Sequence, residues 1–359
     1  LDDIKIAKDK STKGTDINGN ALTRAIHLIG NAADNSLSGG SGNDTIIGGG
    51  GKDSIAAGKG NDMVVVLPNA AGYGSLDGGA GQDTLSFGDV ASYTLYRGNG
   101  LLQLPVNAKK PADGPTVKAS GFEVLAGGAG NDTLAVELGG DGVGWIWGAD
   151  GSVAVGSYSA SAGVTTTPTI KPDITVMEFE HYKGTSAGNF FDARQFTSNG
   201  GNLTLEGGDG QDAFYLGDLT SGKVLLDGKA GSDIFHIGAL AKGTSLLVDG
   251  GKDTAENALY FDTKTDVSVK LNAVGNITTA SMGGVKTGLT AVGITSYTGG
   301  SGNDLLDASS VTSVNSALKI MNLSGGAGND VLRAGKLANG FFVLDGGAGS
   351  DSMVGSAGN

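Results

Sequence analysis

The sequence predicts an all-β protein with very little helix, built as a parallel β-solenoid. Glycine occupies 66 of the 359 positions without the three-residue period of collagen. The six-residue pattern G-G-x-G-x-D recurs along the chain, and short β-prone segments follow its copies. A unit of one tight turn and one short strand cannot bury its apolar side alone. We therefore expect successive units to stack as coils.

The turn motif is complete in eight places, which begin at Gly39, Gly48, Gly78, Gly127, Gly207, Gly299, Gly325 and Gly346. Its glycines permit the positive φ angles of a tight turn and let carbonyl groups crowd around a small centre. Weaker copies begin at Gly30, Ala57, Gly184 and Gly228, and a shortened copy ends at Asp253. The copies from Gly30 and Gly184 end in asparagine, where the motif has aspartate.

The spacing of the aspartates predicts the length of a coil. Residues 39–65 hold three nine-residue units in tandem, so Asp44 and Asp62 should lie on one edge and Asp53 on the other. Further along, Asp212 and Asp233 are separated by 21 residues, with a turn of the form G-x-L-x-x-G between them. For the later chain we therefore predict coils of about 21 residues, with one row of aspartate turns on one edge.

Three gaps between aspartate turns are too long for a single coil. They predict inserted β-hairpin excursions near residues 88–121, 136–178 and 258–293. The stretch "GWIWGADGSVAVG" (144–156) alternates apolar residues around Asp150-Gly151, which is a strong hairpin signal. The stretch "DVSVKLNAVGNITTA" (266–280) has the same form. The excursions thus interrupt the solenoid without ending it.

The predicted organisation has three parts. They are a cap with a lead-in strand over 1–36, a tandem β-roll over 37–66 and a one-edged solenoid over 67–359. The first residue is Leu1 rather than methionine, which indicates a processed or excised piece of a longer protein.

Charge and cysteine content narrow the classes of partner. A formal net charge of −13 argues against nucleic acid and anionic membranes and fits a protein that binds cations. Cysteine is absent, so neither a disulfide framework nor a thiolate metal site is possible. The chain has no run of about 18 apolar residues and no signal-peptide pattern, so we expect no membrane insertion.

The turns have the chemistry of a hard-cation site. Ca²⁺ takes about six to eight oxygen ligands in a flexible geometry, and a glycine turn exposes carbonyl oxygens beside the aspartate. Here the chain resembles the RTX family of secreted bacterial proteins, whose nonapeptide is G-G-x-G-x-D-x-U-x, with U a large apolar residue. Residues 39–47 fit it throughout, and the resemblance covers most of the chain from about Gly30 onward. It implies a β-roll that holds several Ca²⁺ ions between neighbouring coils.

The resemblance implies calcium ligands at the sixth position of each turn. They are Asp44, Asp53, Asp62, Asp83, Asp132, Asp212, Asp233, Asp304, Asp330 and Asp351, with Asp253 in the shortened turn. Acidic residues just before the turns either add ligands or only solvate strand ends: Asp77, Glu206, Asp227, Asp249 and Asp345. Asn189 departs from the pattern, and we expect a weak or empty site beside it. The alternative is a metal-free solenoid in which aspartate only forms turns, but stacked carboxylates would then repel each other.

The sequence gives little support for catalysis. Its three histidines form no H-E-x-x-H zinc motif. One G-x-S-x-G occurs at 184–188, but it aligns with the repeat GGSGND and is better explained as a decayed turn than as a nucleophile elbow around Ser186. Trp145 and Trp147 share one face of a predicted strand, where they would either stack on a sugar or pack against the solenoid.

Together these features predict a secreted calcium-binding structural protein of the bacterial cell surface. It would fold on Ca²⁺ and self-assemble as part of a surface layer, matrix filament or adhesin, without enzyme activity. Two alternatives stay open. One is a non-catalytic calcium-binding module of a larger secreted enzyme, and the other is a carbohydrate- or ice-binding adhesin domain.

Overall fold

Short strands alternate with turns throughout the described part of the chain. The computed structural model describes residues 2–5, 14, 16–67, 74–87, 94–98, 101–103, 116–122, 124–127, 133–137, 142–148, 152–158, 174–177, 179–197, 201–252 and 255–356. All regular elements among them are β-strands, so none is a helix that could cross a membrane. The contacts divide the chain into unit 1 (Leu1–Gly139, Ser152–Ser157 and Ile170–Tyr182) and unit 2 (Gly140–Gly151, Tyr158–Thr169 and Lys183–Asn359). Our predicted boundaries at residues 36 and 66 stay a prediction.

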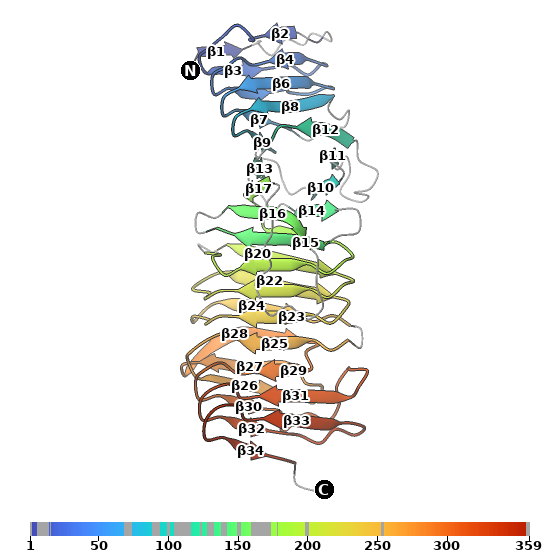
Figure 1. Ribbon diagram of the computed structural model, residues 1–359, viewed down its shortest axis with the longest axis vertical. Helices are drawn as coiled ribbons and strands as arrows, with labels where there is room; N and C mark the ends of the chain where they lie inside the picture. The colour runs from blue at the N-terminus through green and yellow to red at the C-terminus, as the bar shows by residue number, and fades with distance from the viewer. Residues whose placement is uncertain are drawn as a thin grey trace. The chain divides into compact units, whose positions relative to one another are not determined.

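Unit 1 contains two sheets, and the chain passes from one to the other and back. The first sheet consists of β1 (Asp2–Lys5), β3 (Ile26–Ile29), β5 (Thr45–Ile47), β7 (Met63–Val65), β9 (Thr84–Ser86), β13 (Val124–Ala126), β17 (Ile174–Met177) and β16 (Val153–Tyr158). The second consists of β2 (Asp16–Asn18), β4 (Ser36–Ser38), β6 (Ser54–Lys59), β8 (Ser75–Ala80), β12 (Thr116–Ser120), β11 (Leu101–Gln103), β10 (Thr94–Gly98) and β14 (Thr133–Glu137). Strands β3, β5, β7 and β9 pair in parallel (Figure 1).

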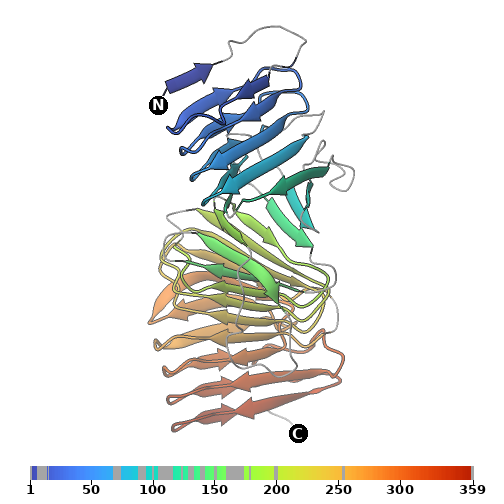
Figure 2. The same ribbon diagram turned by 45° about the horizontal axis from the view of Figure 1, so that its top comes forward.

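Unit 2 repeats this arrangement. Its first sheet consists of β15 (Gly142–Trp147), β19 (Phe190–Ala193), β21 (Ala213–Leu216), β23 (Ile234–Ile237), β25 (Ala258–Phe261), β29 (Ser296–Thr298), β31 (Ile320–Ser324) and β33 (Phe341–Asp345). Its second consists of β20 (Asn202–Gly208), β22 (Lys223–Lys229), β24 (Ser245–Asp249), β28 (Val285–Val292), β27 (Ile277–Met282), β26 (Val267–Leu271), β30 (Leu305–Asp307), β32 (Val331–Arg333) and β34 (Ser352–Val354). Figure 2 shows these strands stacked coil upon coil. The short strand β18 (His181–Lys183) spans the boundary between the units.

Parallel, in-register pairing places equivalent side chains directly above each other. In unit 2, Phe191, Phe214 and Phe235 occupy the same position of β19, β21 and β23 and are fully buried. The ring of Phe214 lies 4.8 Å from that of Phe191 and 4.9 Å from that of Phe235, and the planes of the three rings are nearly parallel. Trp145 extends the stack at 6.3 Å from Phe191. This spacing is the separation of neighbouring strands, about 4.8 Å, so the core is a column of stacked aromatic rings.

The burial of the two tryptophans decides between their two predicted roles. Trp145 is fully buried and Trp147 is 3% exposed. Neither presents an aromatic face to a ligand, so the packing interpretation is correct.

The parallel solenoid and its excursions are confirmed. Strand β21 pairs with β23 so that Ala213 lies opposite Ile234, which is a coil of the predicted length. The first excursion is the antiparallel set β10, β11 and β12, and the third is the antiparallel set β26, β27 and β28. In the second, β16 runs antiparallel to β17, whereas Asp150 and Gly151 lie outside the described residues.

The prediction of one aspartate row on one edge of the later chain is wrong for unit 2. We call the turns that lead into a unit's first sheet its first edge, and those that lead into its second sheet its second edge. Asp212 and Asp233 precede first-sheet strands, whereas Asp304, Asp330 and Asp351 precede second-sheet strands. Between them the excursion places β26, β27 and β28 in the second sheet, and the chain returns to β29 without an aspartate turn. The row therefore changes edge after the excursion.

Candidate metal sites

The sixth residue of the turns lies inside the coil rather than in solvent. Eight of these aspartates are at most 2% exposed: Asp44, Asp53, Asp62, Asp83, Asp212, Asp233, Asp304 and Asp330. In unit 1 they confirm the predicted two edges, because Asp44 and Asp62 precede first-sheet strands and Asp53 precedes a second-sheet strand. Carboxylates are almost never fully buried unless they are paired or bind a metal. Asp132 and Asp253 lie outside the described residues.

One oxygen of each aspartate joins neighbouring coils. Oδ1 of Asp62 accepts the backbone N–H of Asp44 at 2.7 Å, and Oδ1 of Asp83 accepts that of Asp62 at 2.8 Å. The same bond recurs in unit 2. The backbone N–H groups of Asn189, Asp212, Asp304 and Asp330 donate to Oδ1 of Asp212, Asp233, Asp330 and Asp351, respectively. This oxygen therefore has a structural role that needs no metal.

The other oxygen lacks a partner in several turns. Among the described residues, no group donates a hydrogen bond to the buried Oδ2 of Asp53, Asp62 or Asp330. The second glycine of these turns has a positive φ angle, 118° at Gly58 and 96° at Gly326, a conformation that favours glycine. In other turns the N–H of the second glycine donates to Oδ2, from Gly40 to Asp44, from Gly208 to Asp212 and from Gly300 to Asp304. A buried acceptor without a donor costs about 1–3 kcal/mol, so these oxygens fit a bound cation.

In the turns of Asp304 and Asp330 the first glycine lies beside the oxygens that would bind such a ligand. A Cβ atom at Gly325 would lie 2.3 Å from Oδ2 of Asp330 and 2.5 Å from the carbonyl oxygen of Gly346 in the next coil. At Gly299 it would lie 2.3 Å from both Oδ2 of Asp304 and the carbonyl oxygen of Gly325. Carboxylate and carbonyl oxygens of two coils thus converge where only a hydrogen fits on the backbone. This is an oxygen-only donor set, which suits Ca²⁺.

A second ladder occupies the fifth position of the turns, and our sequence reading missed it. Oδ1 of Asn43 accepts the N–H of Asn61 at 2.9 Å, and Oδ1 of Asn61 accepts that of Gln82 at 3.0 Å. Towards the C-terminus the series runs through Asp266, Asn303, Asn329 and Ser350, with each bond at 2.8 Å. In this ladder the later coil donates the N–H, whereas in the aspartate ladder the earlier coil donates it. The repeated Asn-Asp pair in the motif was the available signal.

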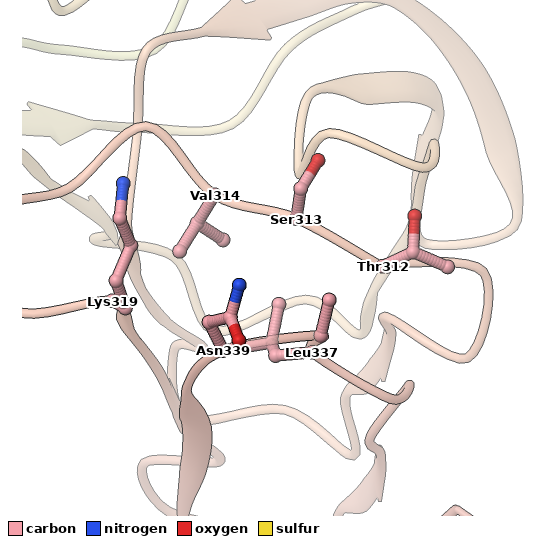
Figure 3. Close-up of a pocket in the computed structure, with 7 residues that line it drawn as sticks. Thr312, Ser313, Val314, Lys319, Leu337 and Asn339 are labelled. Atoms are coloured by element: carbon pink, nitrogen blue, oxygen red, sulfur yellow. The ribbon is translucent and has the colours of Figure 1, made fainter.

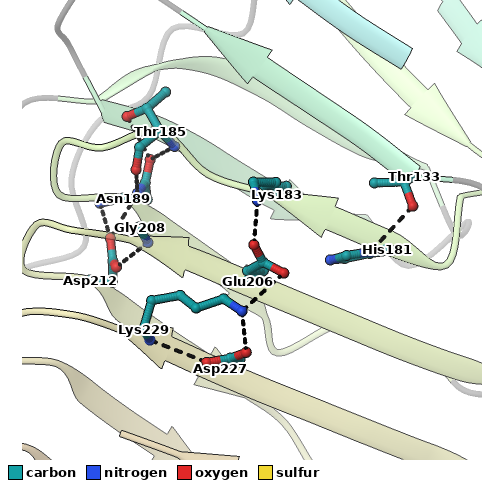
Figure 4. A network of polar contacts seen from close by, with 10 residues as sticks. All are labelled: Thr133, His181, Lys183, Thr185, Asn189, Glu206, Gly208, Asp212, Asp227 and Lys229. Atoms are coloured by element: carbon teal, nitrogen blue, oxygen red, sulfur yellow. Dashed lines mark hydrogen bonds and ion pairs between the residues drawn. The ribbon is translucent and has the colours of Figure 1, made fainter. Parts of the chain in front are cut away.

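The acidic residues before the turns contact other groups. Glu206 forms ion pairs with Lys183 at 2.6 Å and Lys229 at 3.4 Å, and Asp227 pairs with Lys229 at 2.8 Å (Figure 4). Asp249 accepts the N–H of Gly251, Asp345 accepts that of Gly347, and Asp77 accepts the hydroxyl of Ser120. These contacts match strand-end and turn-capping roles, and the role of extra calcium ligand stays a prediction. No three Asp, Glu or His side chains gather into a metal cluster in the described part of the chain, so carbonyl groups would supply most ligands.

The G-x-S-x-G segment is a repeat turn. Asn189 takes the aspartate position, with its N–H bonded to Oδ1 of Asp212 at 2.6 Å. A Cβ at Gly208 would meet the carbonyl of Thr185, which shows the two turns stacked (Figure 4). The strand β19, rather than a helix, follows Ser186. The strand-to-helix elbow that exposes a nucleophilic serine is therefore not formed at this position.

Two surface pockets lie among the described residues of unit 2. One of about 200 Å³ is lined by Thr312, Ser313, Val314, Lys319, Leu337, Ala338 and Asn339 (Figure 3). The other, of about 390 Å³, lies beside Arg194, Tyr215, His236 and Asp262. The His236 ring is stacked between those of Tyr215 at 4.5 Å and Tyr260 at 4.6 Å. Because the rings cover each other's faces, they offer edges rather than a stacking platform to a ligand.

Burial makes the turn carboxyls weak acids when no cation is present. It raises the pKa of Asp62 and Asp304 to about 6 and that of Asp212 to about 7, although hydrogen bonds from backbone N–H groups oppose the shift. The pKa values of Asp53 and Asp330 are raised for the same reason. A raised pKa means that burial favours the protonated carboxyl. A bound divalent cation would instead favour the ionised carboxylate and lower the pKa.

These shifts predict opposite pH responses with and without calcium. A raised pKa in the folded state stabilises the fold below the unfolded pKa of about 3.9, and this stability is lost as the pH rises through 6 to 7. The metal-free protein should therefore become more stable on acidification from about pH 7.5 to about pH 5, whereas calcium affinity should fall because protons compete for the carboxylates. Urea unfolding in metal-free buffer and calcium titrations at both pH values test this. Asp212→Asn is the control, which should weaken the pH dependence, and a metal-free midpoint that falls on acidification would contradict it.

Comparison with known proteins matches part of the turns to a known repeat. The model of the RTX calcium-binding nonapeptide repeat (4 copies) matches residues 29–64, 322–336 and 343–359. These ranges contain Asp44, Asp53, Asp62, Asp330 and Asp351. No curated protein sequence matches the chain. The match includes the three aspartates whose Oδ2 is buried without a donor in the described part of the chain.

Proposed function

Because the chain carries calcium-binding repeats of the RTX family, we propose that it is a secreted, non-enzymatic structural protein of the cell surface. Calcium binding by the repeats drives the folding of the coils and then permits assembly with further copies. Surface layers, matrix filaments and adhesins are the structures that such a component would build.

One observation carries the proposal: the buried Oδ2 atoms of Asp53, Asp62 and Asp330 receive no hydrogen bond from the described residues, and that of Asp330 lies beside the carbonyl oxygen of Gly346 in the next coil. The residues that would hold calcium are the sixth-position aspartates together with carbonyl oxygens of their own and the following turn. An ion there supplies positive charge to a stack of buried carboxylates and joins two coils. These aspartates otherwise only link the coils through Oδ1.

The energetics make calcium a folding cofactor. A ligand at about 100 times its dissociation constant stabilises the folded state by about 2.7 kcal/mol per site. Natural domains have a total stability of only about 5–15 kcal/mol, so a few sites decide whether the coils form. Folding would then follow the calcium concentration, and millimolar extracellular calcium would favour folding outside the cell.

Calcium would also control association between copies. The formal net charge of −13 opposes the approach of a second copy when no cation is bound. Each bound Ca²⁺ cancels two negative charges, so loading several turns removes most of that repulsion. Assembly should therefore require calcium beyond its effect on folding.

A calcium titration tests the proposal. We expect circular dichroism to change from largely disordered to β-rich as calcium rises, and calorimetry to detect several bound ions. Electron microscopy of the same samples should show sheets or fibres only with calcium. A spectrum that is already fully β-rich in EDTA would contradict coupled folding, and monodisperse particles at all calcium concentrations would count against assembly. Magnesium is the control cation, because its demand for near-octahedral geometry disfavours these flexible sites.

A further inference from the structure

Three turns of the repeat carry asparagine instead of aspartate at the sixth position. Asn35 lies in register with Asp53, Asn189 with Asp212, and Asn257 with Asp233. All three side chains are buried, with exposures of 3% or less. Two of them visibly keep the ladder bond: Oδ1 of Asn257 accepts the N–H of Asp233 at 2.7 Å, and Oδ1 of Asn189 accepts that of Val143 at 3.1 Å. The turn before Asn257 has lost the motif, so only the register reveals its position.

The amide nitrogen of each asparagine donates to turn carbonyls. Nδ2 of Asn257 donates to the carbonyl oxygens of Gly250 at 2.6 Å and Gly293 at 3.0 Å. Nδ2 of Asn189 donates to that of Thr185 at 3.1 Å (Figure 4) and to that of Ala187 at 2.7 Å. In the turn of Asn35 the same atom donates to Asn31, Ala33 and, in the next coil, Gly48. An N–H donor thus stands at the first glycine, where Oδ2 points in the aspartate turns.

We propose that Asn35, Asn189 and Asn257 replace a bound cation with their own amide N–H groups, so that these turns stay closed without calcium. The inference rests on the proposed calcium function of the aspartate turns and adds that the chain mixes metal-dependent with metal-independent turns. The physical reason is that the centre of each turn needs a group with positive charge or partial positive charge. Convergent carbonyl oxygens need a positive partner, and an amide supplies two donor hydrogens at the place where a carboxylate oxygen would need a cation.

The positions of these turns divide unit 2 into two parts. Asn189 and Asn257 flank Asp212 and Asp233 on the first edge, around strands β19 to β25. The amide of Asn189 also donates to Oδ1 of Asp212 at 2.8 Å. The same strands carry the stacked phenylalanines of the core. Residues 184–261, which we call the amide segment, should therefore stay folded when calcium is withdrawn.

The C-terminal coils have the opposite character. On the second edge Asp304, Asp330 and Asp351 follow each other, and no asparagine occupies the sixth position in the described turns from 299 to 351. We call residues 299–354 the carboxylate segment. Calcium withdrawal should open it first, so the metal-free chain would retain a folded seed on which these coils re-form when calcium returns.

Hydrogen exchange followed by mass spectrometry tests the division on the unmodified chain. Amides of the carboxylate segment should exchange at least about tenfold faster in EDTA than in calcium, whereas those of the amide segment should keep their protection. Simultaneous loss of protection in both segments would overturn the inference. Full protection of both segments in EDTA would overturn it as well.

A designed calcium site gives the second test. In Asn257→Asp the carboxylate would face the carbonyls of Gly250 and Gly293, so the variant should bind one more Ca²⁺ per chain by calorimetry. In EDTA its β23 and β25 amides should exchange at least about tenfold faster than in the parent, and calcium should restore protection. Asn272→Asp is the control with the same charge change, because its Oδ1 only accepts turn N–H groups from Val274 and Asn276. An unchanged ion count and exchange rate in Asn257→Asp would overturn the inference alone, whereas a parent chain that binds no calcium would overturn the proposed function with it.

Discussion

Phe214→Ala is expected to destabilise unit 2 by about 3–5 kcal/mol in the presence of calcium. Phe214 is fully buried between Phe191 and Phe235, with ring separations of 4.8 and 4.9 Å. In a stacked coil the neighbouring strands are fixed by in-register hydrogen bonds, so the column cannot collapse into the cavity that the ring leaves. Both tryptophans of the chain lie in β15 of the same unit, and Trp145 stacks on Phe191. Tryptophan fluorescence during urea unfolding therefore reports this loss directly.

Tyr215→Ala is the matched control for that substitution. Tyr215 is the next residue on β21 and points to the opposite face, where it stacks on His236 and lies under the Arg194 guanidinium at 5.5 Å. Because its ring is only half-buried, we expect a loss of about 1 kcal/mol. Equal losses in the two variants would show that the aromatic column is not the main source of stability in these coils.

The sequence predicted the length of the coil because the repeated aspartates are the same residues that form the hydrogen-bond ladder between coils. Asp212 and Asp233 are one coil apart in the sequence, and the structure joins them through the N–H of one and Oδ1 of the other. The glycines were equally informative, since a Cβ at Gly325 would collide with the carboxylate of Asp330. Turn geometry and coil length are therefore local properties, and local patterns reveal them.

The edge of each row was not predictable, because both edges accept the same six-residue turn. The distance from Asp233 to Asp304 includes four strands of the second sheet, three of which belong to the excursion, and the sequence does not state how many strands an excursion adds. Asn257 was missed for a related reason: its turn has drifted from the motif, and only pairing of Ala258 with Ile234 shows its register. The edge of each row and the register of Asn257 both depend on the long-range pairing of strands, which a local sequence pattern does not reveal.

Asp330→Ala is expected to remove about 4–6 kcal/mol of stability in saturating calcium, the largest effect that we predict for a single turn. The substitution leaves the buried N–H of Asp304, which donates to Oδ1 of Asp330 at 2.7 Å, without its acceptor. That loss accounts for about 1–3 kcal/mol. It also deletes a carboxylate that would bind calcium, which accounts for about 2.7 kcal/mol when calcium is at about 100 times its dissociation constant.

Comparison with Asp330→Asn separates the two contributions. The asparagine keeps an Oδ1 acceptor for Asp304 and, like Asn257, can donate its amide to the turn carbonyls, so only the calcium contribution should be lost. The free energy of unfolding is measured by urea titration over a series of calcium concentrations. Its slope against the logarithm of calcium concentration should fall by about one to two ions in both variants, because an ion between coils contacts two turns. At every calcium concentration the alanine variant should then lie about 1–3 kcal/mol below the asparagine variant. A slope equal to that of the parent chain in both variants would mean that no calcium is held at Asp330, and the buried Oδ2 would then need a different partner.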